Sequence, residues 1–88
     1  MSQPFSPPAL EGVRVVSLAV NLPGPLAAAR LVSLGASVTK VEPPAGDPLQ
    51  AVAPGWYDEL TAGQEIVTLD LKDPGSRAAL EERLASAD

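Results

Sequence analysis

The sequence predicts an α/β fold built on a parallel sheet, and three observations carry that prediction. Two β-branched apolar runs, residues 13–18 and 38–41, flank an alanine-rich segment with helical spacing. Gly and Pro residues stand at the junctions between these segments, where strand and helix ends need them. A third apolar run at residues 65–71 precedes another helical pattern. Strands and helices that alternate in this way form βαβ units and a parallel sheet.

The first predicted strand, residues 13–18, is almost continuously apolar, as is typical of a parallel strand buried on both faces. Its charged residue, Arg14, is expected near the start of the strand, where the side chain reaches solvent. After the Pro/Gly turn that follows, Pro25 fits the first helical position, because its fixed φ suits a helix and its missing N–H costs nothing there. Apolar residues then recur at spacings of three and four, and Gly35 fits the left-handed residue that ends many helices.

The second strand is predicted over residues 38–41 and ends at Glu42, because the Pro43-Pro44 pair cannot continue a sheet ladder. Residues 45–63 form a long connection. A connection of this length inside a compact domain is usually functional or contains an irregular helix.

The third strand, residues 65–71, leads into a second helix whose cap is either Asp73 or Ser76. The resulting order is β-α-β-loop-β-α, and a parallel sheet of three strands leaves an edge and one face uncovered. We therefore interpret residues 10–88 as the N-terminal part of an incomplete Rossmann-like domain. Residues 1–9, which are rich in Pro and Ser, are interpreted as a flexible arm.

Composition argues against several classes of function. The net charge is −5 and the six basic residues are scattered singly, which argues against a nucleic-acid or anionic membrane partner. The chain has no Cys and no His, which excludes disulfides, thiolate nucleophiles, zinc-thiolate sites and His-based triads, and we expect no metal. No apolar run approaches the roughly 20 residues that span a bilayer, and the N-terminus lacks the pattern of a secretory signal. A cytoplasmic location is therefore expected.

The polar side chains first receive an ordinary structural interpretation. Solvation by water is the expected role of five charged residues: Lys40 and Glu42 at the strand end, and Asp47, Asp58 and Glu59 in the loop. The Trp56-Tyr57 pair is expected to pack as a lid over the sheet edge.

A dinucleotide site requires G-x-G-x-x-G after the first strand and an acid at the end of the second. Glu42 stands at the right strand end, but Gly24 is flanked by prolines. Pro25 removes an N–H group that would hold a pyrophosphate. Binding of NAD or ATP is therefore a weak alternative.

An ordered set of segments resembles the N-terminus of class III CoA-transferases, a family that includes carnitine CoA-transferase, formyl-CoA transferase and alpha-methylacyl-CoA racemase. The segments are LEGVRVVSL (10–18), PGP (23–25), LGASVTKVEPPAGDP (34–48) and LDLK (69–72). No single segment is diagnostic, but their order and spacing together are similar to the family over nearly the whole chain.

The resemblance implies the Rossmann-like N-terminal domain of a longer homodimeric protein that acts on acyl-CoA and carboxylic acid substrates, by transfer or racemisation, with coenzyme A as the carrier. It implies that Asn21, Leu22 and Pro23 make backbone contacts near the acyl group. Pro43 and Leu60 are implied to make apolar contacts with adenine or pantetheine. The family's catalytic aspartate lies beyond the last residue, so no catalytic residue is assigned and the 88-residue chain is expected to be inactive alone.

The sequence also departs from the family in the stretch 61–65, where basic residues are usual and this chain has neutral or acidic ones. That departure puts tight binding of the CoA phosphates in doubt. Two other interpretations stay open: a stand-alone interaction module that dimerises through the exposed sheet edge, and a nucleotide-cofactor domain.

Overall fold

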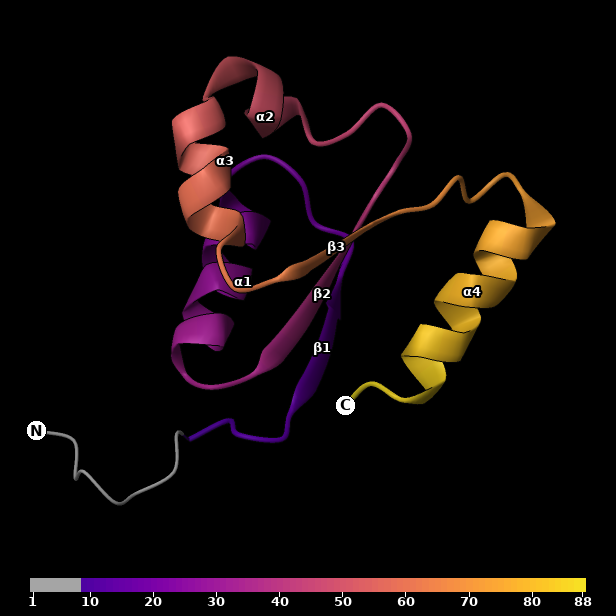
Figure 1. Cartoon of the computed structure of the whole chain (residues 1–88), viewed down its shortest axis with the longest axis horizontal. Helices are drawn as coiled ribbons and strands as arrows, with labels where there is room; N and C mark the ends of the chain where they lie inside the picture. Colours follow the sequence, from indigo (N-terminus) through magenta and orange to yellow (C-terminus); the bar gives the residue numbers. More distant parts are fainter. Residues whose placement is uncertain (1–8) are drawn as a thin grey trace, which may run out of the picture.

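A computed structural model describes residues 9–88, and it confirms the predicted α/β fold with a parallel sheet (Figure 1). Residues 1–8 of the predicted arm lie outside the described residues. The elements are, in order, β1 (Arg14–Ser17), α1 (Pro23–Ser33), β2 (Ser37–Glu42), α2 (Pro48–Val52), α3 (Pro54–Thr61), β3 (Glu65–Thr68) and α4 (Pro74–Ala85).

The sheet has the strand order β1-β2-β3, and both strand pairs are parallel. Val15 of β1 lies opposite Val38 of β2, and Lys40 of β2 lies opposite Ile66 of β3. The helices α1, α2 and α3 lie on one side of the sheet and α4 lies on the other (Figure 1). Because β2 is the central strand and is paired on both edges, it contains most of the buried strand residues.

The hydrophobic core lies between α1 and the sheet. Its buried members are Ala28 of α1, Ala36 just before β2, and Val38 of β2. Partly buried apolar side chains such as Val15 and Leu31 pack around them. The small alanine side chains let α1 pack against the sheet. This packing fixes the N-terminus of α1 relative to the ends of the strands.

The prediction that α1 begins at Pro25 is wrong, because the helix begins two residues earlier, at Pro23. The first turn of a helix contains N–H groups without intrahelical acceptors, so a proline is tolerated at several of its positions. The sequence alone could not distinguish them. Gly35 has a φ of 103°, which confirms the left-handed residue predicted at the end of α1.

The long connection between β2 and β3 contains two short helices, α2 and α3, as a connection of that length suggested. Each helix begins with a proline at its first position. Asp47 caps α2 by accepting a hydrogen bond of 2.9 Å from the N–H group of Leu49. The capping of α4 is equally local, since Asp73 accepts a bond of 3.0 Å from the N–H group of Ser76.

The expectation that the first strand is buried on both faces is wrong. Side chains of β1 are only half-buried, and those of β3 are mostly exposed. The physical reason lies in α4, which buries none of its residues and is separated from the sheet by a cavity of about 200 Å³. An ion pair between Arg83 and Glu65 holds α4 beside the sheet. Two hydrogen bonds between Asp88 and Arg14 do the same: the N–H group of Asp88 donates to the backbone oxygen of Arg14, and the N–H group of Arg14 donates to the carboxylate of Asp88.

We expect the substitution Val38→Ala to lower the free energy of unfolding by about 2 kcal/mol, because Val38 is only 3% exposed and the lost methyl groups leave a cavity. Val52→Ala provides the matched control, since Val52 is 83% exposed and the same change should stay within about 0.5 kcal/mol. Urea denaturation followed by circular dichroism measures both. Equal losses at the two positions would contradict the assignment of the core to the α1 side of the sheet.

Candidate functional site

A cluster of buried polar side chains lies at the carboxyl end of β2, on the side of the sheet that α1 and α3 cover. Its members are Lys40, Glu42, Asp47 and Tyr57. Lys40, Glu42 and Asp47 were expected to be solvated by water. That expectation is wrong, because all three side chains are buried. Asp58 and Glu59, for which the same role was expected, are exposed.

Lys40 is the centre of this cluster and is only 2% exposed. Its Nζ donates a hydrogen bond of 2.6 Å to Oδ2 of Asp47 and another of 3.0 Å to the backbone oxygen of Ala19. The same Nζ lies 3.7 Å from Oε2 of Glu42. Buried ammonium groups require this kind of pairing, because an isolated charge loses its hydration in the interior.

Asp47 uses its second carboxylate oxygen to hold two backbone segments. Oδ1 accepts hydrogen bonds of 2.9 Å from the N–H groups of Asn21 and Leu49. Burial by itself raises the pKa of Asp47, but the hydrogen bond from Lys40 and those from the two amides outweigh it and lower the pKa below its ordinary value. Asp47 is thus held as a carboxylate whose partners come from three parts of the chain.

Tyr57 completes the cluster from α3. Its O–H group donates a hydrogen bond of 2.6 Å to Oε2 of Glu42. Burial and the bond to Glu42 raise the pKa of Tyr57 far above its ordinary value, so the phenol stays a donor. The expected lid of Trp56 and Tyr57 is therefore wrong, because adjacent residues of a helix point in different directions: Tyr57 is buried, whereas Trp56 is 56% exposed.

The turn between β1 and α1 is held in an unusual conformation above this cluster. Asn21 has a φ of 66°, a left-handed value that Asn tolerates better than most residues. A Cβ atom at Gly24 would lie 2.2 Å from Cβ of Ala19, so glycine is required for the start of α1 to pack against the turn. The residues of the predicted acyl-binding turn are therefore fixed by close packing and by hydrogen bonds from the cluster.

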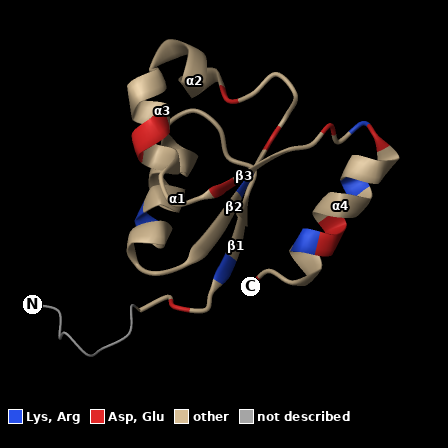
Figure 2. Ribbon diagram, in the orientation of Figure 1, with Lys and Arg blue, Asp and Glu red and all other residues tan. Residues whose placement is uncertain are grey.

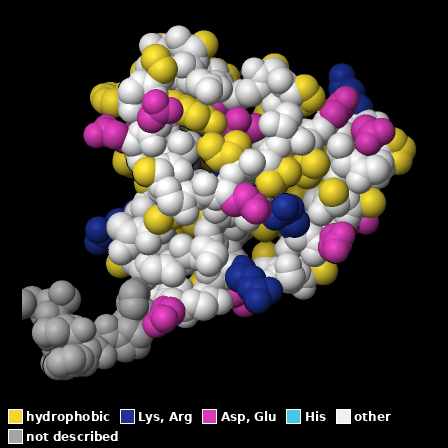
Figure 3. Space-filling model, viewed as in Figure 1, with side chains coloured by type: hydrophobic (Ala, Val, Ile, Leu, Met, Phe, Trp, Pro, Cys, Tyr) yellow, Lys and Arg dark blue, Asp and Glu magenta, His cyan; other side chains and the backbone are white. Residues whose placement is uncertain are grey.

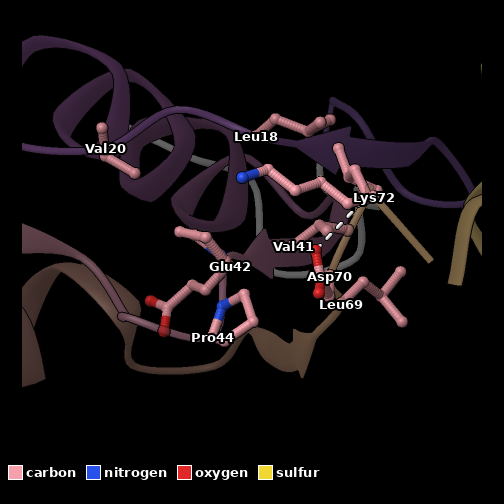
Figure 4. Close-up of a pocket in the computed structure, with 10 residues that line it drawn as sticks. Leu18, Val20, Val41, Glu42, Pro44, Leu69, Asp70 and Lys72 are labelled. Carbon is pink, nitrogen blue, oxygen red and sulfur yellow. Dashed lines mark hydrogen bonds between the residues drawn. The ribbon is translucent and has the colours of Figure 1, made fainter.

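An open pocket of about 340 Å³ lies at the carboxyl edge of the sheet, where the three strands end (Figure 4). Its walls are largely apolar, and it is lined by Leu18, Val20, Val41, Glu42, Pro43, Pro44, Leu69, Asp70, Leu71 and Lys72. The carboxyl edge of a parallel sheet is where open α/β domains bind ligands. Hydrophobic side chains lie exposed on the face between the sheet and α4 (Figure 3).

A second pocket of about 290 Å³ lies between α1 and α3, and it is lined by Leu22, Leu26, Trp56, Glu59 and Leu60. The structure therefore does not bring the five predicted site residues together. Pro43 lines the pocket at the sheet edge, whereas Leu22 and Leu60 line the second one. Asn21 and Pro23 are exposed residues of the intervening turn and line neither pocket.

Sequence reasoning missed Leu69, Leu71 and Lys72 as candidate site residues, although all three line the pocket at the sheet edge. The signal was available, because these residues follow the third strand and parallel strands end at the same edge. The backbone of Lys72 is held by its N–H group, which donates a hydrogen bond of 3.0 Å to Oδ1 of Asp70. The other basic residues of the described part of the chain are spread over α1, β1, β2 and α4, and α4 carries two of them (Figure 2).

Residues 9–88 include no helix with both the length and the apolar content to cross a bilayer. Within the same described part of the chain, no three His, Cys, Asp or Glu side chains are grouped as a metal site would require.

Comparison with known protein families identifies the family of this chain. The sequence profile of CoA-transferase family III matches residues 10–88, nearly the whole chain. The chain belongs to CoA-transferase family III. The family resemblance noted in the sequence is thereby confirmed.

Two relatives of this chain are named as CoA-transferases. The chain is 36% identical to cinnamoyl-CoA:phenyllactate CoA-transferase from Clostridium sporogenes, in a match that covers 88% of this chain and 21% of the relative. It is 32% identical to succinyl-CoA–D-citramalate CoA-transferase from Chloroflexus aurantiacus, covering 100% of this chain and 24% of the relative. The chain therefore spans only about a quarter or less of the length of these relatives.

The fold is shared with a solved family structure. A CAIB/BAIF family protein from Brucella suis superposes with a TM-score of 0.87 at 30% identity, and the match covers 94% of this chain and 25% of that protein. The β-α-β-α-α-β-α arrangement described here is therefore a structural portion of CoA-transferase family III.

We expect the stability of the protein to decrease in acid through Asp47. The pKa of this carboxyl is lowered in the folded state, so its stabilisation is complete above the ordinary value of 3.8 and is lost as the pH falls through the lower folded-state value. Asp47→Asn should lower the free energy of unfolding at pH 7 by about 3 kcal/mol and flatten this acid dependence. Urea denaturation at a series of pH values measures it.

Asp58→Asn is the matched control for this experiment, because Asp58 is exposed on α3. The control should keep both the stability and the acid dependence of the unchanged chain. An Asp47→Asn variant with an unaltered pH profile would contradict the assignment of a strongly held carboxylate at this position.

The substitution Gly24→Ala should destabilise the protein by about 1–3 kcal/mol, because the new methyl group overlaps that of Ala19. The double change Ala19→Gly with Gly24→Ala removes the overlapping methyl group and should recover much of this loss. Thermal unfolding of the three proteins measures the effect. A double variant no more stable than Gly24→Ala alone would show that the close contact is not the cause.

Proposed function

We propose that this chain supplies the CoA-binding N-terminal portion of an enzyme that transfers CoA from an acyl-CoA thioester to a carboxylic acid. The observation that carries the proposal is the apolar pocket at the carboxyl edge of the sheet, directly beside the turn at residues 19–22. Coenzyme A combines an apolar adenine face, a long pantetheine arm and anionic phosphates. The pocket offers apolar walls with the ammonium group of Lys72 at its lining.

In this proposal the adenine or pantetheine packs on Val20, Pro43 and Leu69, which line the same pocket. Lys72 supplies the positive charge that the sequence lacks at residues 61–65, and its place after β3 puts the charge at the strand ends. Ligands of open α/β sheets bind in this crevice. In this proposal the CoA phosphates are bound by Lys72, and not by basic residues in the stretch 61–65, where the family usually has them.

The thioester end is proposed to lie at the turn that contains Asn21, Leu22 and Pro23. The N–H group of Asn21 already donates a hydrogen bond to Asp47. A contact from Asn21 to the acyl group therefore comes from the carbonyl or the side chain of Asn21. Leu60 lies in the second pocket beside Leu22. We assign Leu60 an apolar contact with the acyl or pantetheine portion at that side of the turn.

Transfer is proposed in preference to racemisation, because the named relatives are CoA-transferases. The whole protein is proposed to act as a cytoplasmic homodimer, as the family resemblance implies. No residue of this chain is assigned a catalytic role, so the 88-residue chain alone is proposed to bind the carrier without turning it over.

The test is calorimetric titration of the chain with coenzyme A. Lys72→Gln should weaken binding about tenfold, the effect of losing one charge-assisted hydrogen bond to a phosphate. Arg30→Gln makes the same change of charge at an exposed position of α1, remote from the pocket lining, and should leave the affinity unchanged.

Parallel titrations with NAD and ATP separate this proposal from a nucleotide-cofactor domain. We expect CoA to bind more tightly than either nucleotide, because only CoA places an apolar arm along the pocket walls. Equal affinity for NAD and CoA, or equal losses in the Lys72→Gln and Arg30→Gln proteins, would overturn the assignment of the strand-end pocket.

A further inference from the structure

We propose that the buried Lys40–Asp47 pair is a positioning device that sets the turn at residues 19–22 against the strand-end pocket. The inference rests on the proposed function, because it gives the pair a role in presenting the turn to CoA. Lys40 and Asp47 are positioning residues in this proposal. Neither lines the pocket, and both act through the backbone of the turn.

The first observation is that the pair holds the turn at two points. Lys40 Nζ donates a hydrogen bond of 3.0 Å to the backbone oxygen of Ala19. Oδ1 of Asp47 accepts a hydrogen bond of 2.9 Å from the N–H group of Asn21. The 2.6 Å bond between the two side chains joins these anchors to each other. Val20 lies between the two anchored residues, and Val20 lines the pocket. The pair thus fixes the backbone on both sides of a pocket residue.

The second observation is that a simpler arrangement would serve the ordinary role of a helix cap. Asp73 caps α4 through the same type of bond to a backbone N–H group, yet it is exposed. Asp47 caps α2 in the same manner, but it is also buried against an ammonium group and bonded to Asn21. Capping therefore accounts for the bond to Leu49, and the contacts to Lys40 and Asn21 are left for another role.

The third observation is that the turn has a conformation that needs external support. Asn21 has a left-handed φ of 66°, and the contact between Gly24 and Ala19 leaves no room for a Cβ atom. Residues in sparsely populated backbone regions persist where the surroundings hold them, and such residues cluster at ligand sites. The surroundings here are the hydrogen bonds from Lys40 and Asp47.

The test compares amide hydrogen exchange of the turn with CoA affinity, both measured on the 88-residue chain by NMR. The double variant Lys40→Met with Asp47→Ala removes both charges of the pair together, and Glu42, which loses the ammonium group 3.7 Å away, keeps the hydrogen bond from Tyr57. We expect the Asn21 amide to exchange at least about tenfold faster than in the unchanged chain. CoA affinity should fall by a similar factor, while amides of β2 near Val38 keep their protection.

Tyr57→Phe is the matched control, because it breaks the neighbouring buried bond to Glu42 and leaves both anchors of the turn intact. It should leave the exchange of Asn21 and the CoA affinity within about twofold. Asp47→Asn is the conservative variant, since its amide oxygen can still accept from Asn21. Combined with Lys40→Met, where no ammonium group is left without a partner, it should restore most of the protection that the Lys40→Met, Asp47→Ala variant loses.

The outcomes separate the two proposals. If the turn keeps its protection in the double variant, or if Tyr57→Phe loosens it equally, the positioning role is overturned whatever happens to CoA. If the unchanged chain does not bind CoA, the proposed function fails, and the exchange data still decide whether the pair orders the turn. Faster exchange of Asn21 with unaltered CoA affinity would show an ordered turn that CoA does not use, which also contradicts this inference.

Discussion

The buried ion pair between Lys40 and Asp47 joins three segments that are separate in the sequence: the turn after β1, the end of β2 and the start of α2. Desolvating two charges costs several kcal/mol for each ion, so such a pair persists only where further hydrogen bonds satisfy both partners. Here Ala19, Asn21 and Leu49 supply them through backbone groups. The shape of the carboxyl edge of the sheet follows from that requirement.

The two faces of the sheet differ in how firmly they are packed, and the difference suits a ligand site at their common edge. On one side, α1 lies close to β2 through alanine and valine side chains, and the polar cluster joins α3 to the strand through Tyr57. The helix α4 lies on the other side (Figure 1). It buries none of its residues. The pocket lies at the strand ends, where apolar side chains from the segment after β1, from β2 and from the segment after β3 meet.

The sequence predicted what is encoded locally. The parallel pairing of the strands and the glycine that ends α1 follow from periodicity and from the demands of individual backbone positions, and Asp73, which caps α4, was one of the two caps predicted there. It failed where a residue's partner is distant. Lys40 and Asp47 resemble ordinary solvated charges in the sequence, because their contacts to Ala19 and Asn21 arise only when the turn folds over β2. For the candidate site, the family resemblance named Pro43, which lines the pocket at the sheet edge, whereas Lys72 was missed although its place after the third parallel strand was a signal.

A crystal structure of the protein grown with coenzyme A tests most directly whether the strand-end pocket, beside the turn held by Lys40 and Asp47, receives the carrier. We predict electron density for the adenine or pantetheine against Val20, Pro43 and Leu69, with a phosphate near Lys72. Density for CoA confined to the second pocket, between Leu22 and Trp56, would contradict that placement.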